Sequence, residues 1–179
     1  MVRASLAVGV DLGGTKVAVG LVDADGGLVR RTRRTTDVQA GPEAITAQIA
    51  AAVKELRAVA GPDPICVGVG VAGQVEPDSG RVRFAPNLKW QDVPLGRLLR
   101  EALGLPVAVT NDVRAATWGE WLHGAGQGCD HLVCVFVGTG IGGGVVTHGR
   151  VLEGYAKAAG ELGHMTVALG GPECTCGNR

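Results

Sequence analysis

Two glycine-rich turns, far apart in the chain, have the composition of phosphate-binding turns. The first is Asp11-Leu12-Gly13-Gly14-Thr15-Lys16, and the second is Gly138-Thr139-Gly140-Ile141-Gly142-Gly143-Gly144. Glycines in such turns let backbone N–H groups approach an anion closely and can adopt positive φ, and the threonine adds a hydroxyl donor. Two turns of this kind can hold a polyphosphate from both sides.

The second turn also matches the dinucleotide-binding fingerprint, as Gly138-x-Gly140-x-x-Gly143. That fingerprint needs a helix directly after the glycines and an acidic residue about 20 positions on. The following Val145-Val146-Thr147 indicates a strand instead. The chain also has no Gly-Lys-Ser/Thr ending of a Walker A loop. The pattern therefore disfavours a Rossmann site.

Asn111-Asp112 stands where an expected strand ends and an expected helix begins, the usual place for a site in open α/β folds. Asp112 at this place can also be a simple helix N-cap. Phosphoryl transfer through a loose transition state asks its base mainly to orient a hydroxyl and accept the proton late. A capping aspartate can therefore also be a catalytic base.

Cys174-x-Cys176, with His164 ten residues before it, supplies three of the four ligands that a tetrahedral zinc site needs. Two free thiols in a loop are the alternative that spacing leaves open. The other cysteines stand in or beside apolar strands, where we expect inert residues in or near the core: Cys66, Cys129 and Cys134.

Hydrophobic periodicity and turn residues predict the elements that position these groups. We expect strands over 6–11, 17–22, 28–35, 65–71, 106–110, 131–137 and 142–148, and helices from Pro42, over 95–103 and over 112–123. The order predicts an α/β class, and the recurrence of strand, glycine turn and strand predicts two similar domains. We expect residues 1–115 to form a small N-terminal domain and residues 116–179 to begin a larger C-terminal domain.

The 179 residues are 46% hydrophobic, with 17 basic and 17 acidic side chains, which is typical of a soluble globular protein. Zero net charge argues against a nucleic-acid partner, and the arginines at 30, 31, 33 and 34 fit a solvated strand end. No apolar run reaches membrane-spanning length, and the run from Leu6 to Val10 is too short for the apolar region of a secretion signal. Five cysteines without an export signal favour reduced thiols or metal ligands in the cytoplasm.

Taken together, five motifs resemble the ROK family of sugar kinases and sugar-responsive repressors, and within it the bacterial glucokinases. The motifs are Asp11 to Lys16, Asn111-Asp112, Gly138 to Gly144, Glu161-x-Gly163-His164 and Cys174-x-Cys176-Gly177-Asn178. The resemblance implies an RNase H-like fold of the actin/Hsp70/hexokinase superfamily, with the second domain incomplete here. It also implies ATP-dependent phosphorylation of a hexose, most simply glucose, by a homodimer or homotetramer.

Carried over by position, the resemblance makes Asp112 the base for the sugar 6-hydroxyl and Asp11 a magnesium ligand through water. It implies sugar contacts from Asn87, Asn111, Asp112, Glu161 and His164. It implies ATP contacts from Asp11, Gly13, Gly14, Thr15, Lys16, Gly138, Thr139, Gly140 and Gly142. It implies a structural zinc held by His164, Cys174 and Cys176.

The chain departs from the family pattern at Arg179, before the third cysteine of the zinc motif and before a further sugar-binding glutamate. We therefore expect an N-terminal fragment without kinase activity of its own. A kinase for N-acetylglucosamine, N-acetylmannosamine or fructose, and polyphosphate as donor, stay open. A ROK-type regulator is disfavoured, because a first strand beginning at Leu6 leaves no room for a preceding helix-turn-helix.

Overall fold

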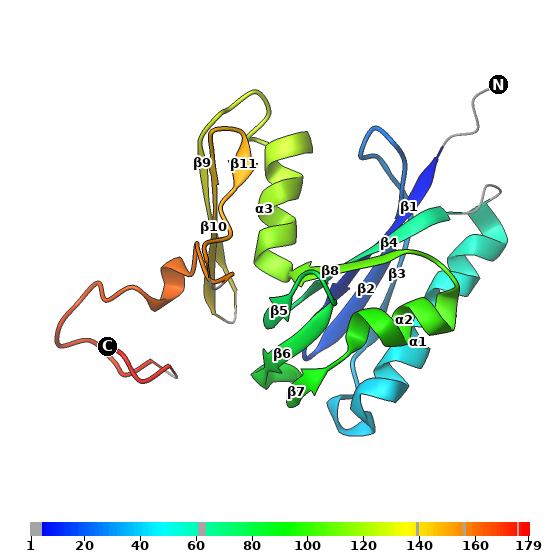
Figure 1. Cartoon of the computed structure of the whole chain (residues 1–179), viewed down its shortest axis with the longest axis horizontal. Coiled ribbons are helices and arrows are strands. Elements are labelled where there is room, and N and C mark those ends of the chain that lie inside the picture. Colours follow the sequence, from blue (N-terminus) through cyan, green and yellow to red (C-terminus); the bar gives the residue numbers. More distant parts are fainter. Residues whose placement is uncertain (1–4, 61–63, 139, 156, 175) are drawn as a thin grey trace. The chain divides into compact units, whose positions relative to one another are not determined.

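The computed structural model describes residues 5–60, 64–138, 140–155, 157–174 and 176–179 (Figure 1). The chain divides into two compact units, Met1–Ala115 and Ala116–Arg179, and each is described by itself.

Unit 1 alternates strands and helices in the order predicted for an α/β domain. Its elements are β1 (Leu6–Leu12), β2 (Lys16–Val22), β3 (Leu28–Thr35), η1 (Val38–Ala40), α1 (Gly41–Ala60), β4 (Pro64–Val71), β5 (Gln74–Glu76), β6 (Arg81–Ala85), η2 (Pro86–Leu88), β7 (Trp90–Val93), α2 (Leu95–Leu103) and β8 (Val107–Asn111). Helix α3 (Asp112–His123) starts at the end of unit 1 and continues into unit 2.

The main sheet of unit 1 has five strands in the order β3-β2-β1-β4-β8. The pairs β1–β2 and β2–β3 are antiparallel, whereas β4 is parallel to both β1 and β8. A second sheet, β5-β6-β7, is antiparallel throughout. Strands β1, β4 and β8 therefore end at the same edge of the main sheet, where open α/β folds place their sites.

Strict alternation gives the main sheet two different faces. In the parallel register of β1 and β4, Val8 pairs with Val67 and Gly9 with Gly68. The large aliphatic residues of this set are buried with the apolar stripe of α1, which includes Ile45, Ile49 and Val53. The opposite face carries mainly glycine and alanine, and these small residues leave space close to the strands.

Unit 2 has a three-stranded sheet in the order β11-β10-β9. Its elements are β9 (Leu132–Val137), β10 (Ile141–Thr147), β11 (Arg150–Val151) and η3 (Leu162–His164). One face of β9 is exposed, with Val133, Val135 and Val137 at 61%, 58% and 80% of their full accessibility. Among the described residues, no helix combines the length and apolar content needed to cross a lipid bilayer.

Most predicted elements are confirmed within a residue or two, and the helices over 95–103 and 112–123 are confirmed at both ends. The sequence pattern missed β5, β6 and β7, because strands of three to five residues are too short to show periodicity. The expectation for Cys129 was wrong: it is exposed, in the turn before β9. Cys66 and Cys134 are half-buried on their strands.

Candidate functional site

Asp11 and Asp112 lie at the same edge of the main sheet of unit 1. Asp11 on β1 is the register partner of Gly70 on β4, and Gly70 is the partner of Thr110 on β8. Asp112 follows β8 as the first residue of α3. A Cβ atom on Gly70 would lie 3.1 Å from the Asp112 Cα, so the glycine lets the start of α3 lie against β4. The strand between the two carboxylates thus has no side chain at this level.

Asn111, and not Asp112, caps the N-terminus of α3. The Asn111 Oδ1 accepts a hydrogen bond from the Arg114 backbone N–H at 3.0 Å, and its Nδ2 donates to the Gly73 carbonyl at 3.2 Å. The interpretation of Asp112 as the N-cap is therefore wrong. Its Oδ1 instead accepts from the Val113 backbone N–H at 2.9 Å. The Asn111 amide keeps one N–H and one oxygen lone pair for a ligand.

The electrostatic surroundings of Asp112 raise the pKa of its carboxyl above the ordinary value. Burial is the largest cause, because removal from water disfavours the charged form. The hydrogen bond from the Val113 N–H lowers the pKa, and the negative charge of Asp11 raises it again. A carboxylate with a raised pKa is a better proton acceptor than an exposed aspartate, which suits a general base.

We expect Asn111→Ala to lower the free energy of unfolding by about 1 kcal/mol, which is the usual cost of losing an N-cap. Asp112→Asn is the matched control, because a neutral amide relieves the burial of a charge and should not lower stability. Denaturant unfolding of both variants of the full-length protein measures the difference. An Asn111→Ala variant as stable as the wild type would contradict the capping role.

The first glycine turn joins the antiparallel strands β1 and β2. The Gly13 N–H donates to the Lys16 carbonyl at 3.0 Å, which closes the turn. Neither Gly13 nor Gly14 uses the positive φ that glycine permits. Gly14 is needed for space: a Cβ atom on it would overlap the backbone carbonyl of Asn87.

Asn87 therefore lies directly against the first glycine turn. It is an exposed residue of η2, and two buried residues that follow it anchor this loop in the core. Leu88 is fully buried, and Trp90 is 3% exposed. Lys89 between them adopts a left-handed conformation with φ of 56°, which turns the chain into β7. The main sheet edge of unit 1 thus brings together Asp11, Gly14, Asn87 and Asp112, while Thr15 and Lys16 continue the same turn.

The second glycine turn joins β9 to β10 in unit 2. The Gly138 N–H donates to the Gly140 carbonyl at 2.8 Å, and Gly142 follows on β10. A Cβ atom on Gly138 or Gly140 would meet nothing within 4 Å, and neither has a positive φ. These glycines leave their backbone open to solvent. Thr139, also predicted to contact phosphate, lies outside the described residues.

The segment with Glu161 and His164 packs on β10 next to this turn. A Cβ atom on Gly143 would lie 2.5 Å from the Gly160 carbonyl oxygen, and one on Gly163 would overlap the Ile141 carbonyl. Glycine at both positions is what permits this close approach. The Glu161 Oε2 lies 4.0 Å from the His164 Nε2, at the two ends of one turn of chain.

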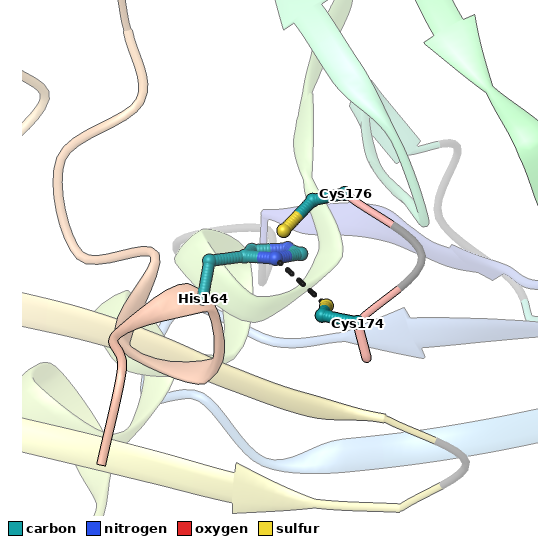
Figure 2. Close-up of side chains that lie close together, drawn as sticks. All are labelled: His164, Cys174 and Cys176. Carbon is teal, nitrogen blue, oxygen red and sulfur yellow. Dashed lines mark hydrogen bonds between the residues drawn. The ribbon is translucent and has the colours of Figure 1, made fainter. Parts of the chain in front are cut away.

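Figure 2 shows that the side chains of His164, Cys174 and Cys176 turn toward one another. Their ligand atoms all lie within 4.8 Å of one another. The Cys174 Sγ lies 3.6 Å from the His164 Nδ1. Two ligands of a tetrahedral zinc ion, with Zn–S of about 2.3 Å and Zn–N of about 2.05 Å, lie about 3.5 Å apart. The donor types and this spacing therefore fit three positions of a zinc site.

The pKa of the Cys174 thiol is lowered to about 7, chiefly because the Cys176 backbone N–H donates a hydrogen bond to it. The side chains of Cys176 and His164 lower the pKa further. A thiol with this pKa is readily available as thiolate, the form that binds metal.

A sequence profile of the ROK family matches residues 7–179. The chain belongs to the ROK family. Its fold is the RNase H-like fold of the actin/Hsp70/hexokinase superfamily. The crystal structure of a ROK family glucokinase from Streptomyces griseus in complex with glucose and AMPPNP superposes with a TM-score of 0.87, at 40% identity over 98% of this chain and 55% of that chain.

Curated relatives of this ROK chain include both enzymes and regulators. A glucokinase from Thermotoga maritima is 44% identical over 96% of this chain and 54% of its own length. A xylose repressor from Bacillus subtilis is 36% identical over 64% of this chain and 30% of its own length. The chain thus spans about half the length of the glucokinases that it matches.

Proposed function

We propose that the protein transfers the γ-phosphoryl group of ATP to the 6-hydroxyl of a hexose, with glucose as the substrate. The observation that carries the proposal is the pair Asp11 and Asp112 at one sheet edge, beside a glycine turn and Asn87. Relatives at 40–44% identity that are named glucokinases support the choice of reaction. The match to a glucokinase bound to glucose and AMPPNP supports the choice of substrates.

In the proposed mechanism, Asp112 is the general base. Its carboxylate accepts a hydrogen bond from the sugar 6-hydroxyl and orients the oxygen toward the γ-phosphorus. As the bond from O6 to phosphorus forms and the bond from phosphorus to the β–γ bridging oxygen breaks, the hydroxyl proton passes to Asp112 and ADP leaves. The raised pKa of Asp112 makes it a better acceptor for that proton.

For the phosphate donor, we propose contacts from each of the two glycine turns. The Gly13 N–H closes the first turn, so the phosphate contacts of the Gly13-Gly14-Thr15 segment come from the N–H groups that follow it. Lys16 is an exposed cation at the start of β2. In unit 2, the turn at Gly138, Gly140 and Gly142 offers a second set of amides. Asp11, whose side chain is exposed, would hold the Mg²⁺ that binds with ATP, through water, and the ion would neutralise phosphate charge.

On the sugar side, we propose hydrogen bonds from Asn87 and Asn111 in unit 1 and from Glu161 and His164 in unit 2. Asn87 lies against the first glycine turn, Asn111 directly precedes Asp112, and the Asn111 amide keeps one N–H and one lone pair for a ligand. We further propose that His164, Cys174 and Cys176 hold a structural zinc. When bound, this ion fixes the loop that carries Glu161.

The test is ATP-dependent phosphorylation by the full-length protein against a panel of sugars. We expect kcat/KM for glucose to exceed that for N-acetylglucosamine, N-acetylmannosamine and fructose by about tenfold or more, because lost polar contacts in a pocket cost at least this much. Replacing ATP by polyphosphate tests the donor. A tenfold preference for another sugar would overturn the choice of glucose while retaining the kinase.

A regulator is the second candidate function, favoured by the similarity to a xylose repressor. It would bind a sugar without turning over ATP. Glucose binding with no ADP formation in the full-length protein would therefore favour it. We also propose a cytoplasmic homodimer or homotetramer, which sedimentation analysis of the full-length protein tests.

The pH profile offers a second test of the base. Asp112 accepts a proton only when ionised, and its pKa is raised by burial and by Asp11. As the pH is lowered, Asp112 therefore becomes protonated at a higher pH than an exposed aspartate does. We expect kcat/KM to start falling while the pH is still above the ordinary aspartate pKa of about 4. Thermal unfolding over the same pH range controls for loss of fold. A flat profile down to about pH 4 would contradict the assignment.

A further inference from the structure

Thr36, the residue after β3, contacts the first glycine turn through two hydrogen bonds. Its Oγ1 donates to the Gly13 carbonyl at 2.9 Å, and its backbone N–H donates to the Thr15 carbonyl at 3.0 Å. The residue is only 6% exposed. One buried residue directly after β3 thus donates hydrogen bonds to the carbonyl groups of Gly13 and Thr15.

These bonds determine which way the turn presents its amides. In a trans peptide unit the C=O of one residue and the N–H of the next point in opposite directions. A Gly13 carbonyl directed at Thr36 therefore directs the Gly14 N–H away from it. Within the described part of the chain, the Gly14 N–H has no hydrogen-bond acceptor. This N–H is therefore available to bind an anion. The hydrogen bond from Thr36 keeps the peptide from rotating the N–H toward the protein interior.

We propose that Thr36 is a positioning residue for the phosphate donor: its hydroxyl fixes the Gly13–Gly14 peptide so that the amide faces the phosphates of a nucleoside triphosphate. The proposal rests on the proposed kinase function. Preorganised amides bind an anion better than amides that must first reorient. The Thr36 hydroxyl should therefore affect affinity for the phosphate donor and leave affinity for the sugar unchanged.

The position of Thr36 is itself fixed from α1. The Gln48 Nε2 on that helix donates to the Thr35 carbonyl at 2.9 Å, so the end of β3 is held next to the turn. The same helix offers a matched control residue. Thr46 is 5% exposed, and its Oγ1 donates to the Pro42 carbonyl at 2.7 Å, within α1 itself.

The experiment compares Thr36→Val, Thr36→Ser and Thr46→Val in the full-length protein. Both valine variants remove one buried hydroxyl that donates to a backbone carbonyl, and should lose similar stability. Only Thr36→Val should raise KM for ATP and the Kd for AMPPNP, by about three- to tenfold, the usual effect of one hydrogen bond. KM for glucose should stay within about twofold, and Thr36→Ser should restore donor affinity.

Three outcomes would overturn the proposal. These are an unchanged Kd for AMPPNP in folded Thr36→Val, an equal loss in Thr46→Val, and a loss in Thr36→Ser as large as in Thr36→Val. Calorimetric titration with AMPPNP gives this readout without turnover. Failure of the kinase function looks different, because the wild type itself would then form no ADP from ATP and glucose.

Discussion

Asp112→Asn should lower kcat for glucose phosphorylation by about 100-fold or more in the full-length protein, while glucose affinity changes only a few-fold. The amide keeps the size of the side chain but cannot accept the hydroxyl proton, and general-base catalysis contributes about 10²- to 10⁴-fold. An effect on kcat with little effect on sugar binding is the signature of an interaction made in the transition state. Steady-state kinetics and calorimetric glucose titration measure the two quantities.

Stability gives this prediction an internal control. Because burial raises the pKa of Asp112, the folded state favours its neutral form, and its ionisation at neutral pH opposes folding. Asp112→Asn should therefore unfold at the same temperature as the wild type or higher. Asp92→Asn removes an exposed carboxylate that pairs with Arg81 at 2.9 Å, and should leave kcat unchanged. Near-normal kcat in Asp112→Asn would refute its role as base.

Local patterns in the sequence predicted most of unit 1, because each signal depends on neighbouring residues. The apolar residues of 6–11, followed by a glycine turn, predicted a strand there, and the structure confirms that strand. Strand β8 and α3 follow in the same way from an apolar run and a helix start at 112.

Contacts between distant segments were not predictable from such patterns. The role of Gly70 depends on the register of β4 between β1 and β8, which no local pattern specifies. The same holds for Gly14 against Asn87 and for Gly163 against Ile141, where a glycine matters because of a carbonyl elsewhere in the chain. The N-cap was assigned to the wrong neighbour, since Asn and Asp are equally good caps and only side-chain geometry distinguishes them.

The proposed zinc site should be sensitive to single thiol substitutions. We expect the full-length protein to bind about one zinc ion per chain, and Cys174→Ser and Cys176→Ser each to remove most of it, because thiolate is the ligand that zinc favours. His164 is both one of the three proposed zinc ligands and a residue of η3. This short helix follows Glu161 and packs on β10. Loss of the metal should therefore also raise KM for glucose, by about tenfold.

Cys129→Ser is the matched control, since this thiol is exposed like that of Cys176 but lies before β9, away from the three proposed zinc ligands. It should leave zinc content, thermal unfolding temperature and glucose KM unchanged. Metal analysis, thermal unfolding and kinetics on all three variants distinguish a structural ion from two free thiols. Zinc-free wild-type protein with full activity would contradict the site. Full zinc content in both Cys174→Ser and Cys176→Ser would show that these cysteines are not its ligands. Parallel losses of zinc and of glucose affinity would show that the metal supports the sugar-binding loop.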